Sequence, residues 1–558
     1  MGAENLSQSD QLAAQILAAL TAAVDRGEIS CTIPASVRLE RPKNRDHGDF
    51  ATSIALQLAK SSGRPPLEVA QMLQRDLQSL AEVAKVDIAG PGFINITLNS
   101  ADLAELVRTV ITAGATYGNS TALAGTAINL EFISANPTGP LHLGHTRWAA
   151  VGDALGRVLS AAGAKVAREF YINDRGNQMD LFGQSVRAAA VGEAIPENGY
   201  QGAYIHDLAK AVIAQQPGLM KLLGQEQLDA FREAAYKLQL AQQQQVLEDF
   251  GTHFDVWFSE RTLHEGGSVA HGLEKLRKQG HVFDEDGAIW LRTTDFGDDK
   301  DRVLVKSDGE LTYFASDTAY YINKRERGFD ICIYMLGADH HGYVGRLKAT
   351  AACAGDDPAK NIDVLIGQLV KIMEGGEEVK LSKRAGTIIT LEDLVEKVGV
   401  DAARYTLIRY PVDTPMVLDV DVLKKRTNDN PVYYVQYAHA RIAGVLRNAA
   451  ELQVSAKLED FDPAMLTHER ENELLGAIGK FPAVVASAAE LREPHRVARY
   501  LEELAGEYHR FYADCRVLPL GDEAVAPVHH ARAALSAATM QTLANGLALL
   551  GVSAPDRM

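Results

Sequence analysis

Two histidines, His142 and His145, lie in a turn rich in glycine and proline, Ser134-Ala135-Asn136-Pro137-Thr138-Gly139-Pro140-Leu141-His142-Leu143-Gly144-His145. The apolar run before it, Thr126–Ser134, predicts a buried parallel strand, and a helix is expected to begin near Thr146. Helix N-termini present unpaired N–H groups to phosphate, and imidazoles beside them can contact the same anion. The turn therefore predicts a phosphate-binding site, although two histidines at a helix start could also simply cap the helix.

A second run of residues that could take part in chemistry is Val379-Lys380-Leu381-Ser382-Lys383-Arg384-Ala385-Gly386-Thr387, preceded by Gly375 and Gly376. Lysines on a mobile, glycine-flanked loop are point charges that can neutralise a phosphate leaving group. Taken alone, such a run is more often a solvated surface turn. Its position after the histidine turn, on the same predicted sheet, favours the functional interpretation.

The composition bounds the class of protein. A chain of 558 residues is too long for one hydrophobic core, and 46% hydrophobic with 23% charged residues is typical of a soluble globular enzyme. No apolar run approaches the ~20 residues that span a bilayer, so no membrane insertion is expected. The cysteines have no C-x-x-C spacing, which supports neither zinc nor a disulfide framework and fits a reducing cytoplasm. The net charge of −17 argues against non-specific polyanion binding but leaves room for a local basic face.

The elements predict a multidomain α/β protein. Residues 1–112 predict an α+β domain with strands at Val83–Ile88 and Phe93–Leu98, followed by a linker, Gly114–Gly125. Residues 113–425 predict a Rossmann-type, doubly wound parallel sheet with an insertion at about 190–301. Residues 426–558 follow helical periodicity and predict an all-helical bundle. Further sheet strands are expected near Lys165–Ile172, Ile331–Leu336 and Asp363–Leu369.

The runs His142–His145 and Lys380–Arg384 resemble the two signature motifs of class I aminoacyl-tRNA synthetases. Four segments resemble the arginyl-tRNA synthetases in particular, namely Ala135–His145, Tyr313–Asp317, Leu336–Tyr343 and Asp429–Arg441. The resemblance covers almost the whole chain. It implies that the N-terminal domain, with its segment Asp46-His47-Gly48-Asp49-Phe50, contacts the outer corner of the tRNA, and that Asp429–Arg441 opens an anticodon-binding domain.

A guanidinium requires planar carboxylate partners in a pocket that excludes water, and Glu131, Asp317 and Asp339 lie near predicted strand ends. By similarity to the family, Glu131, Tyr313 and Asp317 would hold the guanidinium. Asn136 and Asp339 would bind the α-amino and carboxylate end, although some family members carry Gln at the position of Asp339. Each acid could instead be a surface carboxylate or part of a local salt bridge, and Tyr313 could be a core aromatic residue.

The resemblance implies an arginine–tRNA ligase that uses ATP with Mg²⁺ and no zinc. L-Arginine would attack the α-phosphorus of ATP to form arginyl-adenylate and pyrophosphate, and the 2′-OH at the tRNA 3′ end would then accept arginine. His142 and His145 would stabilise the pentavalent phosphate, and Lys380 and Lys383 the leaving group. The expected ATP-binding residues are Gly144, His142, His145, Leu381, Ser382 and Lys383.

The implied macromolecular partner is tRNA(Arg), and the family is usually monomeric and needs bound tRNA to activate arginine. A cytoplasmic location without a membrane is expected. In the predicted bundle, Tyr433, Tyr434 and Tyr437 could stack on anticodon bases while Arg441 contacts phosphate. Tyrosines at this helical spacing could equally pack between helices.

Two other classes of protein share parts of the pattern. A metabolite nucleotidyltransferase would have the histidine turn and the parallel sheet, but it would need neither the N-terminal domain nor the C-terminal helices. A non-catalytic tRNA-binding relative would keep the fold, but drift would be expected to erode at least one of His142, Gly144, His145, Lys380 and Lys383. Within the class, a lysyl enzyme is the most easily confused on charge alone.

Overall fold

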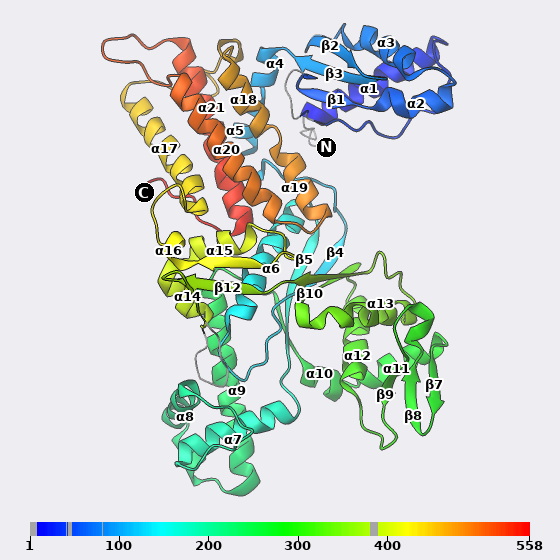
Figure 1. Ribbon diagram of the computed structural model, residues 1–558, viewed down its shortest axis with the longest axis vertical. Coiled ribbons are helices and arrows are strands. Elements are labelled where there is room, and N and C mark those ends of the chain that lie inside the picture. Colours follow the sequence, from blue (N-terminus) through cyan, green and yellow to red (C-terminus); the bar gives the residue numbers. More distant parts are fainter. Residues whose placement is uncertain (1–7, 41, 43–46, 81, 380–388) are drawn as a thin grey trace.

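The computed structural model describes residues 8–40, 42, 47–80, 82–379 and 389–558. Figure 1 shows an elongated molecule with a central sheet between a helical bundle above it and two separate lobes below it. The N-terminal domain lies beside the far end of the bundle. Regions far apart in the sequence therefore meet at the central sheet.

The N-terminal domain has its own apolar core, which includes Ile16, Leu73 and Ile94. Its antiparallel sheet has the strand order β1-β3-β2, and the two strands predicted around the Gly90–Gly92 turn are confirmed as β2 and β3. The elements are α1 (Gln8–Asp25), β1 (Phe50–Thr52), α2 (Ile54–Ser62), α3 (Pro66–Leu77), β2 (Val83–Ala89) and β3 (Phe93–Leu98).

The central sheet has the strand order β11-β10-β4-β5-β6, and every pair is parallel. The chain runs outward from β4 through β5 to β6 on one side and continues through β10 and β11 on the other. This change of direction next to β4 is where doubly wound sheets bind ligands, beyond the carboxyl ends of the strands. The strands are β4 (Ala127–Glu131), β5 (Lys165–Ile172), β6 (Val256–Ser259), β10 (Ile331–Gly337) and β11 (Ile362–Gly367).

Helix α6 (Leu143–Ala161) begins before the expected start near Thr146. The difference arises because His142 has an extended backbone and caps the helix with its side chain. Gly152 lets α6 lie directly on β4, since a Cβ atom there would be 2.3 Å from the Phe132 ring. The close approach places the start of α6 beside the end of β4.

The insertion expected at about 190–301 is not continuous, because β6 lies inside that interval and pairs with β5 in the central sheet. A strand of four residues is too short to be recognised by periodicity. Two lobes result. The first contains α7 (Asn177–Val191), α8 (Ala203–Gln215), η3 (Pro217–Lys221) and α9 (Gly224–Asp249).

The second lobe has an antiparallel sheet of order β7-β8-β9, and its apolar core includes Leu276, Leu291 and Tyr321. It leads back into the central sheet through α12 and β10. The elements of this lobe and its return are α10 (Glu260–Glu265), α11 (Ser268–Lys278), β7 (Val282–Glu285), β8 (Ala288–Leu291), η4 (Thr293–Phe296), β9 (Arg302–Val305), α12 (Tyr313–Glu326), η5 (Ala338–Tyr343) and α13 (Val344–Cys353).

A small sheet of order β13-β12-β14 connects the central sheet to the bundle. β12 is antiparallel to β13 and parallel to β14. The elements of this connecting region are β12 (Val370–Glu374), β13 (Glu377–Glu378), α14 (Leu391–Val398), α15 (Val400–Ile408), β14 (Met416–Asp419) and α16 (Val420–Leu423).

The helical bundle confirms the all-helical prediction for the C-terminal part. The expected linker at 114–125 packs against it, because Asn545 donates hydrogen bonds to the carbonyls of Gly114 and Tyr117. α21 has the length and apolar composition of a membrane span, but 67% of its most apolar window is buried, as in a core helix. The elements are α4 (Ser100–Ala104), α5 (Leu106–Ala113), η2 (Gly114–Thr116), α17 (Pro431–Glu451), η6 (Pro463–Met465), α18 (Glu469–Ile478), α19 (Phe481–Glu490), α20 (His495–Asp514) and α21 (Pro527–Leu550).

Candidate active site

The two histidines lie at the N-terminus of α6, where their rings accept hydrogen bonds from the backbone of the same turn. Nδ1 of His142 accepts from the Gly144 N–H at 3.1 Å, and Nδ1 of His145 accepts from the His142 N–H at 3.4 Å. Their rings stack with centroids 4.0 Å apart. Because Nδ1 accepts in each ring, a neutral imidazole carries its proton on Nε2. Capping and phosphate binding are therefore compatible, since they use different ring nitrogens.

The lysine motif residues Lys380, Leu381, Ser382 and Lys383 lie outside the described residues, but both flanks of the segment are described. On the upstream side, the Val379 N–H donates to the Ile372 carbonyl of β12 at 2.9 Å. On the downstream side, the Leu143 N–H donates to the Ile389 carbonyl at 3.1 Å. The Leu391 N–H donates to the Leu141 carbonyl at 3.0 Å. The chain thus returns from the lysine motif directly onto the histidine turn.

Carboxylates gather beyond the carboxyl edge of the central sheet. Glu131 ends β4, Glu260 follows β6, and Asp317 lies on α12. All three act electrostatically on Tyr171 of β5, whose pKa is raised first by burial and then by these charges. Residues from four different elements therefore form one anionic cluster, the candidate arginine pocket.

The three acids differ in whether a basic side chain is paired with them. Lys324 pairs with Glu131 at 2.5 Å. Among the described residues, neither Glu260 nor Asp317 has a Lys or Arg nitrogen within 4.0 Å. Burial, followed by the charge of Asp317, raises the pKa of Glu260 to about 7. Burial raises the pKa of Asp317 to about 6, against the hydrogen bond donated by Tyr343. These two carboxylates are the ones that a bound cation would stabilise most.

The other residues predicted for the arginine site lie at its margin. Tyr313 is 75% exposed and lies at the start of α12, on the same face as Asp317 one turn later. Asn136 donates to Gln178 at 2.7 Å. Asp339 is 81% exposed and lines a cavity of about 750 Å³ together with Tyr343. The structure does not bring Asn136 or Asp339 into contact with the buried acids.

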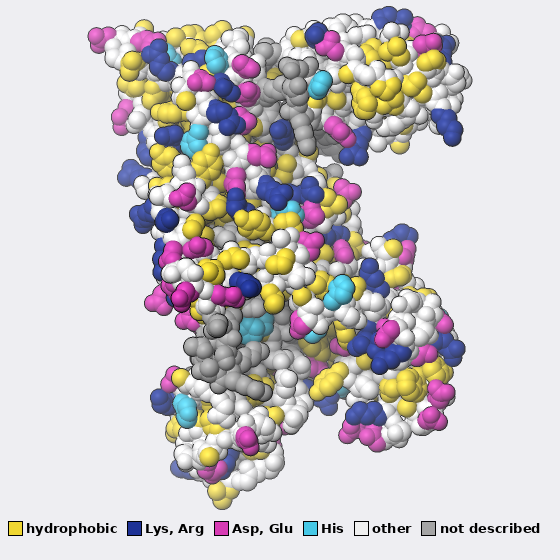
Figure 2. All heavy atoms as spheres, viewed as in Figure 1, with side chains coloured by type: hydrophobic (Ala, Val, Ile, Leu, Met, Phe, Trp, Pro, Cys, Tyr) yellow, Lys and Arg dark blue, Asp and Glu magenta, His cyan; other side chains and the backbone are white. Residues whose placement is uncertain are grey.

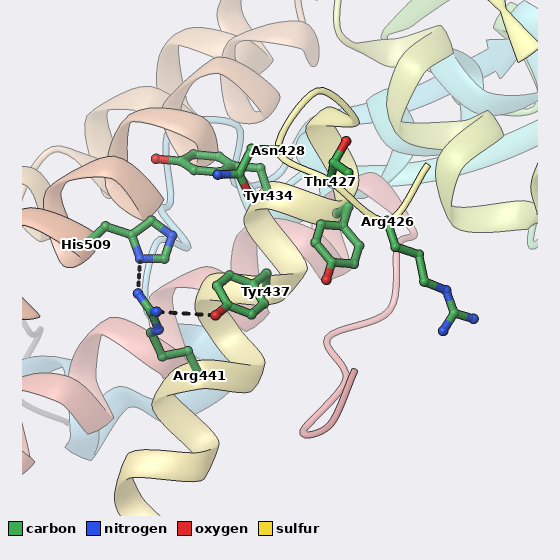
Figure 3. A pocket seen from close by; sticks show the side chains of 8 residues that line it. Arg426, Thr427, Asn428, Tyr434, Tyr437, Arg441 and His509 are labelled. Carbon is green, nitrogen blue, oxygen red and sulfur yellow. Dashed lines mark hydrogen bonds between the residues drawn. The ribbon is translucent and has the colours of Figure 1, made fainter. Parts of the chain in front are cut away.

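A second cavity, of about 680 Å³, lies on the bundle and contains all three residues predicted to bind tRNA. The rings of Tyr433 and Tyr437 are parallel, with centroids 6.0 Å apart. Arg441 donates to the Tyr437 hydroxyl at 3.2 Å and lies 3.2 Å from Nδ1 of His509 on α20 (Figure 3). Burial and the neighbouring Arg441 lower the pKa of His509 to about 4, so it is neutral at pH 7 and accepts this hydrogen bond.

The charged side chains on the face shown in Figure 2 are mixed in sign, but Lys and Arg gather at the edge where α17 meets α16. There, Lys424, Lys425 and Arg426 line a cavity of about 520 Å³. It shares Arg426 and Tyr433 with the cavity of Figure 3, so the two adjoin. These residues form a local basic surface, which the acidic net charge of the whole chain does not exclude.

Three residues of these sites were not predicted from the sequence, namely Glu260, Lys324 and His509. Glu260 follows a strand that the sequence did not reveal. Lys324 and His509 lie within charged helical segments, where nothing in the pattern distinguishes them from solvated residues. Only the carboxyl end of a recognised β6 could have indicated Glu260.

The chain matches known protein families along nearly its whole length. The arginyl tRNA synthetase N terminal domain matches residues 10–98, and the catalytic domain of the class I (R) tRNA synthetases matches residues 107–438. The DALR anticodon binding domain matches residues 435–558. The parallel sheet, the histidine turn and the catalytic-domain match together define a class I aminoacyl-tRNA synthetase.

Relatives narrow the class to one family. An arginine–tRNA ligase from Kineococcus radiotolerans is 57% identical over 98% of this chain and 99% of its own length. One from Paenarthrobacter aurescens is 56% identical over 98% and 100%, respectively. The solved structure of Thermus thermophilus arginyl-tRNA synthetase shares the fold, with a TM-score of 0.75 at 21% identity over 98% of this chain and 99% of that one. The chain belongs to the arginyl-tRNA synthetase family.

Proposed function

We propose that the protein activates L-arginine with ATP, forming arginyl-adenylate and pyrophosphate, and then transfers arginine to the 3′ end of tRNA(Arg). Family membership supports this arginine–tRNA ligase reaction as a whole. The observation that carries the substrate assignment is the pair of acids Glu260, which is buried, and Asp317, which is half-buried, without a resident Lys or Arg partner among the described residues.

In the arginine pocket, Asp317 and Glu260 would form charge-assisted hydrogen bonds with the two edges of the guanidinium. Tyr313 would cover the pocket mouth from the first turn of α12. Glu131 closes the floor of the pocket and is already bound to Lys324. By family resemblance, Asn136 and Asp339 would bind the α-amino and carboxylate groups of arginine.

The phosphates of ATP would lie at the start of α6, where Nε2–H groups of His142 and His145 can donate to the α-phosphate as its negative charge grows. Gly144 leaves room for the nucleotide at the helix start. Leu381, Ser382 and the two lysines, Lys380 and Lys383, are proposed to close over the pyrophosphate from the segment tethered to this turn.

Magnesium is proposed to arrive with ATP as part of the substrate. Within the described parts of the chain, no group of three or more His, Cys, Asp or Glu side chains could hold a metal ion. Mg²⁺ coordinated mainly by phosphate oxygens suits such a site, since the ion retains water and needs few protein ligands. It would neutralise charge on the leaving pyrophosphate.

The first reaction needs no general base, because the arginine carboxylate is ionised at neutral pH and attacks the α-phosphorus directly. The residues around the pocket contribute by aligning this carboxylate with ATP and by excluding water. In the second step, a ribose hydroxyl of the tRNA attacks the adenylate carbonyl. Tyr433, Tyr437 and Arg441 are proposed to hold the anticodon on the bundle, in a monomeric, cytoplasmic enzyme.

ATP–pyrophosphate exchange tests the proposal, with each amino acid supplied in turn, with and without total tRNA. Exchange with arginine alone, dependent on tRNA, is the expected result. Exchange with lysine or another amino acid would overturn the substrate assignment. The absence of exchange under every condition would indicate a non-catalytic relative.

A further inference from the structure

A lysine lies buried beneath the arginine pocket. The side chain of Lys324, on α12, is 0% exposed, and its Nζ is 2.5 Å from Oε2 of Glu131. The ammonium group also lies 3.8 Å from the centre of the Tyr334 ring and 4.3 Å from that of Tyr320. A buried ammonium group is costly unless it is paired, and the Glu131 carboxylate and the two rings provide that pairing here.

The position of Glu131 explains what this cation affects. Glu131 is the last residue of β4, and its charge contributes to the raised pKa of Asp317. Its other oxygen, Oε1, accepts a hydrogen bond from Ser134 at 3.0 Å. Both oxygens of Glu131 are therefore engaged within the protein, whereas Asp317 is left for the substrate.

We propose that Lys324 is a positioning residue for arginine recognition: it neutralises and orients Glu131, so that the pocket offers the substrate guanidinium Asp317 and Glu260 rather than three competing carboxylates. The inference deepens the proposed function and rests on it. Glu131 then acts from the floor of the pocket and is not a direct ligand of the guanidinium.

The physical reason is the proximity of like charges. Without Lys324, the Glu131 carboxylate would lie unpaired beside Asp317, and repulsion would favour the protonated form of Asp317. A protonated acid no longer attracts a guanidinium. Arginine binding would then require a higher pH, because a more alkaline solution would be needed to ionise Asp317.

Other charged groups facing the two acids are unchanged by substitution of Lys324. Asp317 also faces Tyr343 of η5 and Arg346 of α13. Glu260 faces Tyr171, Asp174 and Arg175 near the end of β5, in addition to Asp317. His264, one turn later on the same short helix, lies 3.7 Å from Glu260. They form a constant background against which the charge beside Asp317 can be varied.

The test measures KM for arginine in ATP–pyrophosphate exchange with saturating tRNA, between about pH 5 and about pH 9. We expect K324M to move the pH midpoint of the arginine KM upward by about half a pH unit or more, with a smaller effect on kcat at high pH. The double variant E131Q/K324M should return the midpoint to that of the wild type. R325M serves as the control, because it removes the ion pair of a neighbouring α12 residue with Asp356.

The outcomes separate the hypotheses. An unchanged midpoint in K324M, or the same shift in R325M, would overturn the proposal. If K324M does not fold, the double variant E131Q/K324M tests the proposal instead. An arginine KM within about threefold of wild type in that variant would support the proposal. A loss of arginine binding at every pH would show that Glu131 is a direct ligand of the guanidinium, and would overturn it. Wild-type protein without arginine-dependent exchange would instead reject the proposed function itself.

Discussion

The proposed arginine pocket and the tyrosine-lined cavity of the bundle are built in opposite ways. The pocket is anionic and buried, and its groups come from β4, β5, α10 and α12, separated by long stretches of chain. The bundle cavity is half-exposed and carries Arg426 and Arg441, and most of its lining comes from α17 and the residues just before it. One region suits a small cation and the other suits a polyanion.

The difference shows how an acidic protein can bind both ligands. A guanidinium needs fixed carboxylates in a dry site, where each contact is strong and its loss is costly. An RNA loop is bound by stacking and phosphate contacts that are individually weaker and tolerant of solvent. Substitutions in the pocket should therefore weaken arginine binding strongly and leave tRNA binding unchanged. Substitutions in the cavity should weaken tRNA binding mildly and leave arginine binding unchanged.

The largest effect is expected for Asp317→Asn, which removes a half-buried carboxylate from the pocket. We expect kcat/KM for arginine to fall on the order of 10³-fold, because a charge-assisted hydrogen bond is lost. Exchange assays measure this, and filter binding should give an unchanged Kd for tRNA. Glu326→Gln, an exposed acid on the same helix, is the matched control. A parallel loss of tRNA affinity in Asp317→Asn would show that the two regions are not independent.

A smaller but still large effect is expected from His142→Asn. Asparagine also accepts a hydrogen bond at a helix N-cap, so the helix start is retained while the imidazole is lost. We expect kcat to fall about 10²-fold with little change in Tm. His142→Ala should lose the same activity and about 1 kcal/mol of stability as well. Near wild-type kcat in the asparagine variant would reduce His142 to a helix cap.

An effect of about tenfold on the KM for tRNA is expected from Tyr437→Ala, through the loss of base stacking. The KM for arginine should not change. Tyr437→Phe keeps the ring and loses only the hydroxyl that accepts from Arg441, so it should retain most tRNA affinity. Unfolding at lower temperature without a change in tRNA binding would instead show that Tyr437 only packs between helices.

The smallest effect is the pH dependence of arginine binding, and its sign follows from the raised pKa values of Glu260, about 7, and Asp317, about 6. The guanidinium prefers ionised acids, so arginine should bind best above pH 7 and more weakly as the pH falls through both values. Since the two acids interact, they should titrate as a pair, with a loss of about twofold between about pH 8 and about pH 7 and a steeper loss below. The KM for tRNA, measured over the same range, is the comparison. An arginine KM that is flat between about pH 6 and about pH 8 would contradict the assignment.

The sequence and the structure agree best where a feature is formed by neighbouring residues. The histidine turn could be recognised because its strand, glycines and helix are contiguous, and Tyr433, Tyr437 and Arg441 because they share one face of α17. The prediction of a single, continuous insertion at about 190–301 was wrong, because the short strand β6 belongs to the central sheet. Its correct placement also identifies Glu260, which local patterns could not assign.

The sequence alone determined the histidine turn, the parallel sheet and the helical bundle, because turn chemistry and periodicity are local properties. Only the tertiary structure decided which of the acids form an ion pair with a basic side chain. Lys324 stands in the sequence between Asn323 and Arg325, like any lysine of a solvated helix. The packing of α12 against β4 and β10 buries it on Glu131, and burial makes its charge matter because little water remains to screen it.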